Sequence, residues 1–161
     1  MGWLRLGLVV LVVVSALVGA SVPAQQTLVV ASVDDGETLL TVPVQEDTRV
    51  ALSYTHSVEQ TRVVDTYRVR DGQLEMTRMR FESYGWGLPA DANVSRVNGS
   101  FVYDPPGTFE TVTVKPGRIA GHRLHVGNRS YDLVARSDAR AVRIAVDRRS
   151  ALAVTIDHFT P

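Results

Sequence analysis

The sequence predicts an all-β domain, either a β-sandwich or a partly open β-barrel of short antiparallel strands, preceded by an N-terminal hydrophobic helix. From Thr27 onward apolar and polar residues alternate with period two, which is typical of strands that bury one face. β-Branched residues recur in short runs, and Gly, Asp and Asn separate these runs. Many short strands with brief connections are typical of a sandwich or a barrel.

Turn residues divide the alternating pattern into ten expected strands. Asp71-Gly72 joins two runs and suits a type I′ hairpin turn, in which both central residues need positive φ. Asp34-Asp35-Gly36 and Gly127-Asn128 are similar turns, and "DRRS" is expected to join the last two runs in a hairpin that leaves Arg143 outside. The expected strands are 28–33, 38–44, 49–56, 63–70, 73–82, 108–114, 122–126, 129–134, 141–146 and 152–157.

One long segment, from Ser83 to Gly107, interrupts the strand pattern. It is rich in Gly, Pro, Asn and Ser and contains only a brief apolar run. A connection of this length is uncommon inside a compact domain and often carries function. We therefore expect an irregular loop here, and we find no domain boundary after residue 27.

The N-terminal segment, residues 1–26, has the layout of an export signal. Arg5 precedes an apolar run that extends to Val18, and small residues follow it. The run is also close to the length that spans a bilayer, so both a cleaved signal peptide and a retained membrane anchor remain open. Residues 27–161 are then expected to form a single extracytoplasmic β domain, exported and either anchored at the extracellular face of the membrane or secreted. Three Asn-x-Ser sequons agree with surface loops on an exported chain, at Asn93, Asn98 and Asn128.

Composition excludes several classes of function. The formal net charge is 0, so no global field favours nucleic acid, and we expect no nucleic-acid partner. The chain has no cysteine, which excludes disulfides, thiolate zinc sites and thiol catalysis. No metal or cofactor motif is present, and we expect neither a metal site nor a cofactor.

Polar residues in the stretch "SYTHSVEQTRVVDTYRV" are the main candidates for a site. Alternation places Tyr54 and His56 on the apolar face of their strand, and it places Asp65 and Tyr67 on the apolar face of the next. If the two runs pair, Asp65 lies within reach of His56, and we expect a hydrogen bond between them because burying either side chain alone is costly. Two interpretations remain open. The cluster is either a buried polar network that fixes strand register or the floor of a ligand pocket with Glu59 and Arg62 at its rim.

The spacing of the histidines, of Ser57 and of the loop glycines argues against catalytic, metal or phosphate sites. His56 and Ser57 are adjacent on a strand and point to opposite faces, which excludes a base and nucleophile pair. His122 and His125 are three residues apart and again face opposite sides, so they do not suit a shared metal ion. The glycines of "YGWGLP" lack the spacing of a phosphate-binding loop.

"YTHSVEQTRVVDTYRV" followed by "MRFESYGWGLP" resembles the uncharacterised family catalogued as domain of unknown function 1850. That family shows a Tyr-x-His-Ser-Val segment, then an acidic residue and a tyrosine, then a Gly-x-Gly-Leu-Pro segment. Aspartate stands at 65 where glutamate is expected more often. The pattern falls on Tyr54, His56, Ser57, Val58, Asp65, Tyr67, Gly85, Gly87, Leu88 and Pro89, with Glu59 extending the first segment.

The resemblance implies a small exported protein, often encoded beside the membrane component of tripartite ATP-independent (TRAP) transporters of the TAXI kind, which move organic acids. It implies no activity. It also implies that the His-Ser-Val hairpin and the Gly-Leu-Pro loop belong to one pattern and converge in space.

We therefore expect a non-enzymatic accessory protein that contacts the membrane subunit of such a transporter or its binding protein. The alternative is a free-standing module that binds a small carboxylate with His56, Arg62 and the loop 85–89. A third and weaker alternative is a hydrolase that uses His56 and Asp65 as acid and base.

Overall fold

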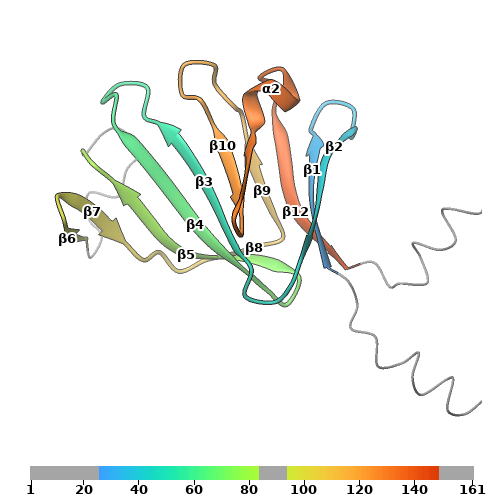
Figure 1. Ribbon diagram of the computed structural model, residues 1–161, viewed down its shortest axis with the longest axis horizontal. Coiled ribbons are helices and arrows are strands. Elements are labelled where there is room, and N and C mark those ends of the chain that lie inside the picture. Colours follow the sequence, from blue (N-terminus) through green and yellow to red (C-terminus); the bar gives the residue numbers. More distant parts are fainter. Residues whose placement is uncertain (1–25, 84–93, 149–161) are drawn as a thin grey trace, which may run out of the picture. The chain divides into compact units, whose positions relative to one another are not determined.

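The computed structural model describes residues 26–83 and 94–148 of the 161-residue chain, which form two antiparallel β-sheets and one short helix (Figure 1). The prediction of an all-β domain is confirmed. The predicted N-terminal helix, the predicted strand 152–157 and the Gly-Leu-Pro loop lie outside the described residues.

The smaller sheet has four strands in the order β2, β1, β12, β9. Over residues 142–145, β12 pairs with β1 along one edge and with β9 along the other. A strand has only two edges, and both edges of residues 142–145 are occupied by β1 and β9. The predicted hairpin pairing of residues 142–145 with 152–157 is therefore wrong. The bounds are β1 Gln26–Ser32, β2 Thr38–Val44, β9 Thr111–Val114 and β12 Val142–Arg148.

The larger sheet has the order β11, β10, β3, β4, β5, β7, β6, and β8 also pairs with β5. The predicted type I′ geometry at Asp71-Gly72 is supported by φ values of 49° and 74°, and this turn joins β4 to β5. The bounds are β3 Arg49–Thr55, β4 Arg62–Arg70, β5 Gln73–Phe81, β6 Ser95–Val97, β7 Ser100–Tyr103, β8 Thr108–Phe109, β10 Arg123–Val126 and β11 Arg129–Asp132.

Two segments differ from the sequence prediction because of local turn chemistry. Part of the expected irregular loop forms the hairpin β6–β7, whose two-residue turn Asn98-Gly99 has φ values of 49° and 83°. The predicted strand 108–114 is interrupted at Glu110, where the chain leaves the larger sheet as β8 and enters the smaller one as β9.

The predicted strand 129–134 also ends early, because the helix α2, Leu133–Ser137, begins after Asp132. The Asp132 carboxylate caps this helix by accepting a hydrogen bond from the backbone N–H of Ala135 at 3.0 Å. Leu133 is fully buried, so the turn of helix places one apolar side chain in the core. Within the described residues no helix is long and apolar enough to cross a membrane.

One hydrophobic core lies between the two sheets. The smaller sheet contributes Leu28 and Ile144, and the larger sheet contributes Leu52 and Leu124, all at most 6% exposed. Each such side chain removed from water stabilises the fold by roughly 1.5–3 kcal/mol. We call the core-facing side of the larger sheet its inner face and the opposite side its outer face. The outer face carries the exposed side chains of the same strands.

Candidate functional site

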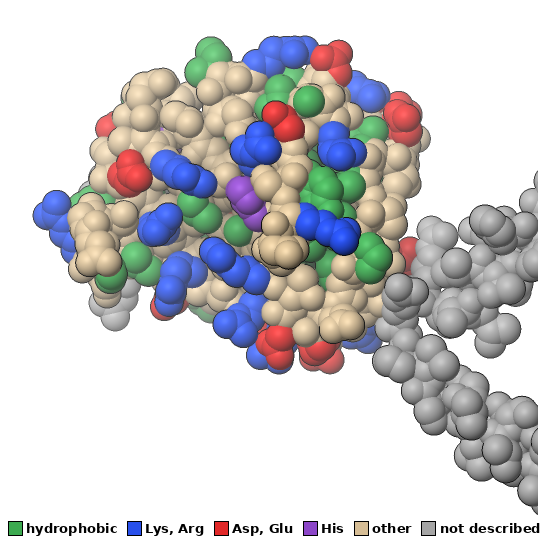
Figure 2. All heavy atoms as spheres, viewed as in Figure 1, with side chains coloured by type: hydrophobic (Ala, Val, Ile, Leu, Met, Phe, Trp, Pro, Cys, Tyr) green, Lys and Arg blue, Asp and Glu red, His purple; other side chains and the backbone are tan. Residues whose placement is uncertain are grey.

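Arginine side chains dominate the outer face of the larger sheet. The alternation of β3 and β4 buries the apolar residues and directs the intervening positions outward, and cross-strand partners on β5 and β10 share that face. In Figure 2, Lys and Arg side chains gather over this sheet around a histidine. The exposed arginines of the outer face are Arg49, Arg62, Arg68, Arg70, Arg78, Arg80 and Arg123.

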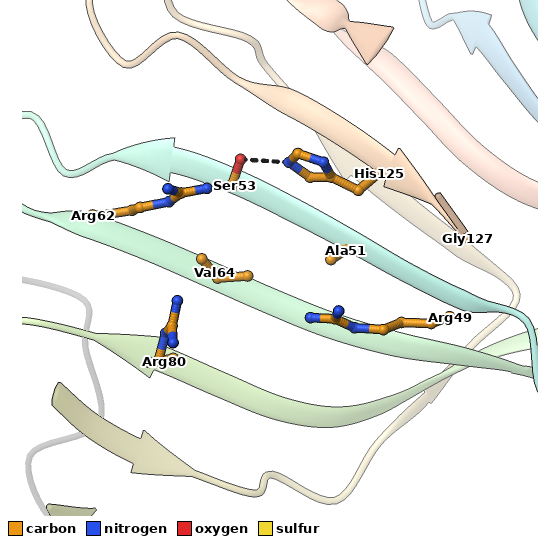
Figure 3. Close-up of a pocket in the computed structure, with 8 residues that line it drawn as sticks. All are labelled: Arg49, Ala51, Ser53, Arg62, Val64, Arg80, His125 and Gly127. Atoms are coloured by element: carbon orange, nitrogen blue, oxygen red, sulfur yellow. Dashed lines mark hydrogen bonds between the residues drawn. The ribbon is translucent and has the colours of Figure 1, made fainter. Parts of the chain in front are cut away.

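A groove with a volume of about 230 Å³ crosses the middle of this face, from β10 over β3 and β4 to β5. The residues Ala51, Ser53 and Val64 have short side chains, whereas the arginines beside them are long, and this difference in length makes the hollow (Figure 3). We call this hollow the outer groove. Its lining consists of Arg49, Ala51, Ser53, Arg62, Val64, Arg80, His125 and Gly127.

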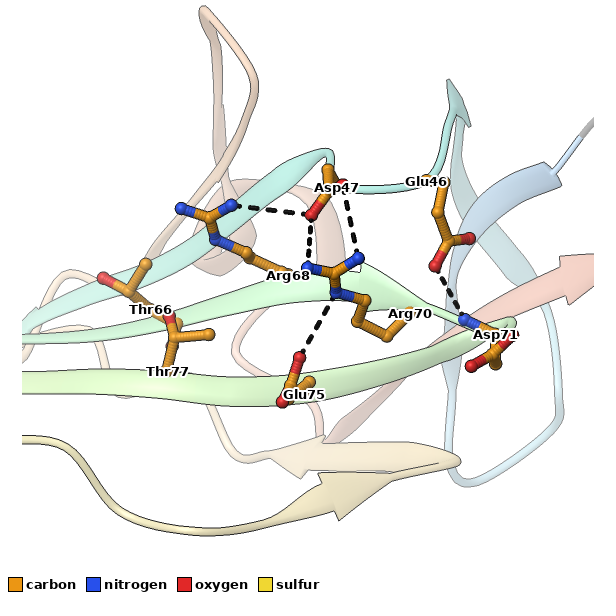
Figure 4. Close-up of polar contacts among 8 residues, drawn as sticks. All are labelled: Glu46, Asp47, Thr66, Arg68, Arg70, Asp71, Glu75 and Thr77. Atoms are coloured by element: carbon orange, nitrogen blue, oxygen red, sulfur yellow. Dashed lines mark hydrogen bonds and ion pairs between the residues drawn. The ribbon is translucent and has the colours of Figure 1, made fainter.

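The three arginines of the outer groove differ from the other arginines of the face in their counter-charges. Within the described residues, Arg49, Arg62 and Arg80 form no ion pair. The remaining arginines are paired at the margin, and Figure 4 shows the pairs made by Asp47. The marginal pairs are Arg68–Asp47 at 3.5 Å, Arg70–Asp47 at 2.9 Å, Arg78–Asp104 at 3.1 Å and Arg123–Asp132 at 3.5 Å.

A hydrogen bond between Ser53 and His125 lies on the floor of the outer groove. Ser53 Oγ and His125 Nε2 are 2.9 Å apart, and the two residues come from the adjacent strands β3 and β10. Burial lowers the pKa of His125, and the positive charges of Arg62, Arg123 and Arg49 lower it further. His125 is therefore mainly neutral at neutral pH, and the hydroxyl and imidazole form a polar floor between the guanidinium groups.

A second polar cluster lies on the inner face of the same strands. Asp65 is 7% exposed, and the Tyr54 hydroxyl donates a hydrogen bond to its carboxylate. Burial raises the pKa of Asp65 to about 6. Burial and the charge of Asp65 raise the pKa of Tyr54 to about 12, and the same two causes raise the pKa of Tyr67. The Tyr54 ring also stacks on His122, with centroids 4.9 Å apart.

One oxygen of this inner cluster lacks a hydrogen bond within the described part of the chain. This atom is the buried Asp65 Oδ1. Alternation correctly places Tyr54, Asp65 and Tyr67 on one inward face. The hydrogen-bond partner seen for Asp65 is Tyr54, and the predicted hydrogen bond between Asp65 and His56 stays a prediction.

His56 lies in the turn that follows β3 rather than in the strand itself. Its Nδ1 accepts a hydrogen bond from the backbone N–H of Glu59 at 3.3 Å, and its backbone N–H donates to Thr61 at 2.8 Å. The exposed Ser57 and Val58 occupy the tip of this turn. Ser83 Oγ, at the end of β5, donates to Glu59 Oε2 at 2.9 Å. The His-Ser-Val turn thus contacts the residue next to the segment that contains the Gly-Leu-Pro residues.

Arg62 and Asp65, two of the predicted site residues, lie on opposite faces of the larger sheet. Arg62 begins β4 and lines the outer groove, whereas Asp65 points to the inner face of that strand. The cause is parity, because residues three apart on a strand face opposite sides. The other predicted loop residues, Gly85, Gly87, Leu88 and Pro89, lie outside the described part of the chain.

Comparison with protein families assigns this domain to a known family. Residues 50–133, from β3 to the start of α2, match the family described as "Domain of unknown function (DUF1850)". The chain belongs to this family. Comparison with curated proteins and with solved structures gives no match. Most of the outer groove lies within the residues that match the DUF1850 family, including Ser53, Arg62, Arg80 and His125.

Sequence reasoning on this DUF1850 member missed Arg49, Ser53, Arg80 and His125 as site residues. The alternation that assigned the inner face also assigned these residues to the outer one, so their common side could have been predicted. Their convergence could not, because it depends on the register of four strands. Within residues 26–83 and 94–148, no three His, Asp or Glu side chains are placed to hold a metal ion.

Proposed function

We propose that this protein binds a small carboxylate-bearing anion in the outer groove. The observation that carries the proposal is the set of three arginines, Arg49, Arg62 and Arg80, that surround one hollow without an acidic partner among the described residues. Guanidinium groups remain protonated at all physiological pH values. The hollow is therefore a site of concentrated positive charge.

Arginine chemistry favours a carboxylate as the ligand group. The planar guanidinium presents a fork of N–H donors that matches the two oxygens of a carboxylate, and such charge-assisted hydrogen bonds are stronger than neutral ones. The carboxylates that form ion pairs on the outer face bind arginines at its margin rather than those of the groove. Like charges held together repel each other, and a bound anion would relieve this repulsion.

The size of the hollow favours a small molecule. Its volume of about 230 Å³ is below the range of roughly 300–1,000 Å³ that is usual for sites of drug-sized ligands. Ser53 and His125 add a hydroxyl and an imidazole on the floor, and these groups would fix the orientation of the ligand by hydrogen bonding.

The test is titration calorimetry of the full-length chain with small carboxylates at low ionic strength. We expect measurable binding that weakens as salt is added, because salt screens charge attraction at this exposed site. The variant Arg49→Gln/Arg62→Gln/Arg80→Gln should lose binding. Arg78→Gln is the matched control, because it removes one exposed arginine of the same face that is already paired with Asp104. Equal affinity of the triple variant and the native chain would refute the proposal.

A second candidate function is that of an accessory protein to an organic-acid transporter outside the cytoplasm. The apolar N-terminal run, as a helical signal peptide or anchor, supports export. Two sheets that share one core support the description of the exported domain as a β-sandwich. A cationic hollow suits a protein that works with organic acids. A pull-down from native membranes, with partners identified by mass spectrometry, tests this role; recovery without a transporter membrane subunit or binding protein would contradict it.

A further inference from the structure

The cations of the outer groove lie at two separate ends. Strand register places Ser53 beside Val64 and Val64 beside Arg80, so Arg80 belongs to the row that contains Ser53. Arg62 precedes Val64 by two residues on the same strand and also belongs to this end. The backbone of Arg49 lies four residues before that of Ser53 along β3, about 13 Å away along the strand, and the Arg49 side chain extends from there into the groove.

The part of the groove between these ends combines two short apolar side chains with the polar pair Ser53 and His125. Ala51 and Val64 form its floor, and His125 lies beside Ala51 on β10. In Figure 3 the Arg49 side chain reaches in from one end to a point beside Ala51, whereas Arg62 and Arg80 lie at the other end on either side of Val64. Along its length the groove therefore has Arg49 at one end, the short side chains of Ala51 and Val64 in its middle, and Arg62 and Arg80 at the other end.

We propose that the ligand of the outer groove is a dicarboxylate whose two carboxylates are joined by a short hydrocarbon chain. This inference rests on the proposed function, because it specifies the anion that the same site binds. One carboxylate is held by Arg62 and Arg80, the methylene groups pass over Ala51 and Val64, and the second carboxylate is held by Arg49.

Compact anions do not fit this arrangement as well. Inorganic phosphate or a monocarboxylate held by Arg62 and Arg80 leaves Arg49 without a counter-charge. A dicarboxylate of suitable length neutralises both ends, and its hydrocarbon middle lies against Ala51 and Val64 rather than against charged groups.

The experiment measures the affinity of the full-length chain for succinate, glutarate and adipate. Each acid is compared with the monocarboxylate of the same carbon number, and inorganic phosphate is included. At least one dicarboxylate should bind about tenfold or more tightly than its match, as expected for one additional charge-assisted interaction. Arg49→Gln should abolish this preference, lowering the affinity for the dicarboxylate far more than the affinity for its matched monocarboxylate, because only the dicarboxylate places a carboxylate at the Arg49 end. Arg78→Gln, with its partner Asp104 outside the groove, should change neither affinity.

The outcomes separate this inference from the proposed function. Equal affinities within every matched pair, or tighter binding of phosphate than of any dicarboxylate, would refute the dicarboxylate while an anion site remains. A dicarboxylate preference that survives Arg49→Gln would also refute it, because the second carboxylate would then be held elsewhere. Absence of any carboxylate or phosphate binding would refute both.

Discussion

Replacing Asp65 by asparagine should stabilise the protein at neutral and alkaline pH. Asp65 is 7% exposed, and burial raises its pKa from 3.8 to about 6. The folded protein therefore holds a proton on this carboxyl in a pH range where the unfolded chain has released it. Stability falls as pH rises from about 3.8 to about 6, and above that range the cost of the buried charge is constant.

The size of this effect follows from the two pKa values. At 1.36 kcal/mol per pKa unit, the interval between 3.8 and about 6 corresponds to about 3 kcal/mol. Asparagine has nearly the same shape, cannot ionise, and can still accept the hydrogen bond from the Tyr54 hydroxyl. We therefore expect Asp65→Asn to raise the free energy of unfolding by up to about 3 kcal/mol at pH 8 and to leave it nearly unchanged at pH 4.

Urea unfolding followed by far-UV circular dichroism at pH 4, 6 and 8 measures this difference. Asp104→Asn is the control, because Asp104 is an exposed carboxylate in a surface ion pair, which contributes about 0–1 kcal/mol. An Asp65→Asn variant that is less stable than the native chain at pH 8, or a difference in stability that does not change between pH 4 and pH 8, would refute the reasoning.

Three further changes test other parts of the structure. Tyr54→Phe removes the hydrogen bond to Asp65, and urea unfolding at pH 8 should show a loss of about 1.5–3 kcal/mol that decreases at pH 4, where the carboxyl is neutral. The outer groove should bind carboxylates more tightly as pH falls, because a protonated His125 adds a fourth cation. Titration calorimetry should show that His125→Gln loses this pH dependence. If the variant keeps it, His125 is not the cause. Gly72→Ala should lower stability in thermal unfolding by about 1 kcal/mol because φ is +74° there, whereas Gly117→Ala, outside the left-handed region, should have a smaller effect.

Alternation predicted which side chains share a face because it is a property of a single strand. It correctly placed Tyr54, Asp65 and Tyr67 inward and Arg68 and Arg70 outward. It could not predict the partner of Asp65, because that depends on where β3 ends. The strand ends at Thr55, and the next residue already belongs to the turn.

The outer groove could not be predicted because it combines four strands from distant parts of the sequence. Its shape depends on the pairing of β10 with β3 and on the bulge between Thr66 and Tyr67, which shifts the register of β5 against β4. The helix α2 escaped prediction for a local reason. Its first residues, Leu133 and Val134, are apolar and extend the run that begins at Arg129, and only the cap residue Asp132 distinguishes a turn of helix from a strand.

The inner cluster and the outer groove are linked by strand register. Asp65 directly follows Val64 on β4, and Tyr54 directly follows Ser53 on β3, so the two sites lie back to back on the same pair of strands. A slip of one residue would turn Val64 toward the core and Asp65 toward solvent, and on β4 it would bury Arg62. The hydrogen bond between Tyr54 and Asp65 forms only in the observed register. A carboxyl that costs stability at neutral pH therefore also specifies the pairing that brings Arg62 and Arg80 to the same end of the groove.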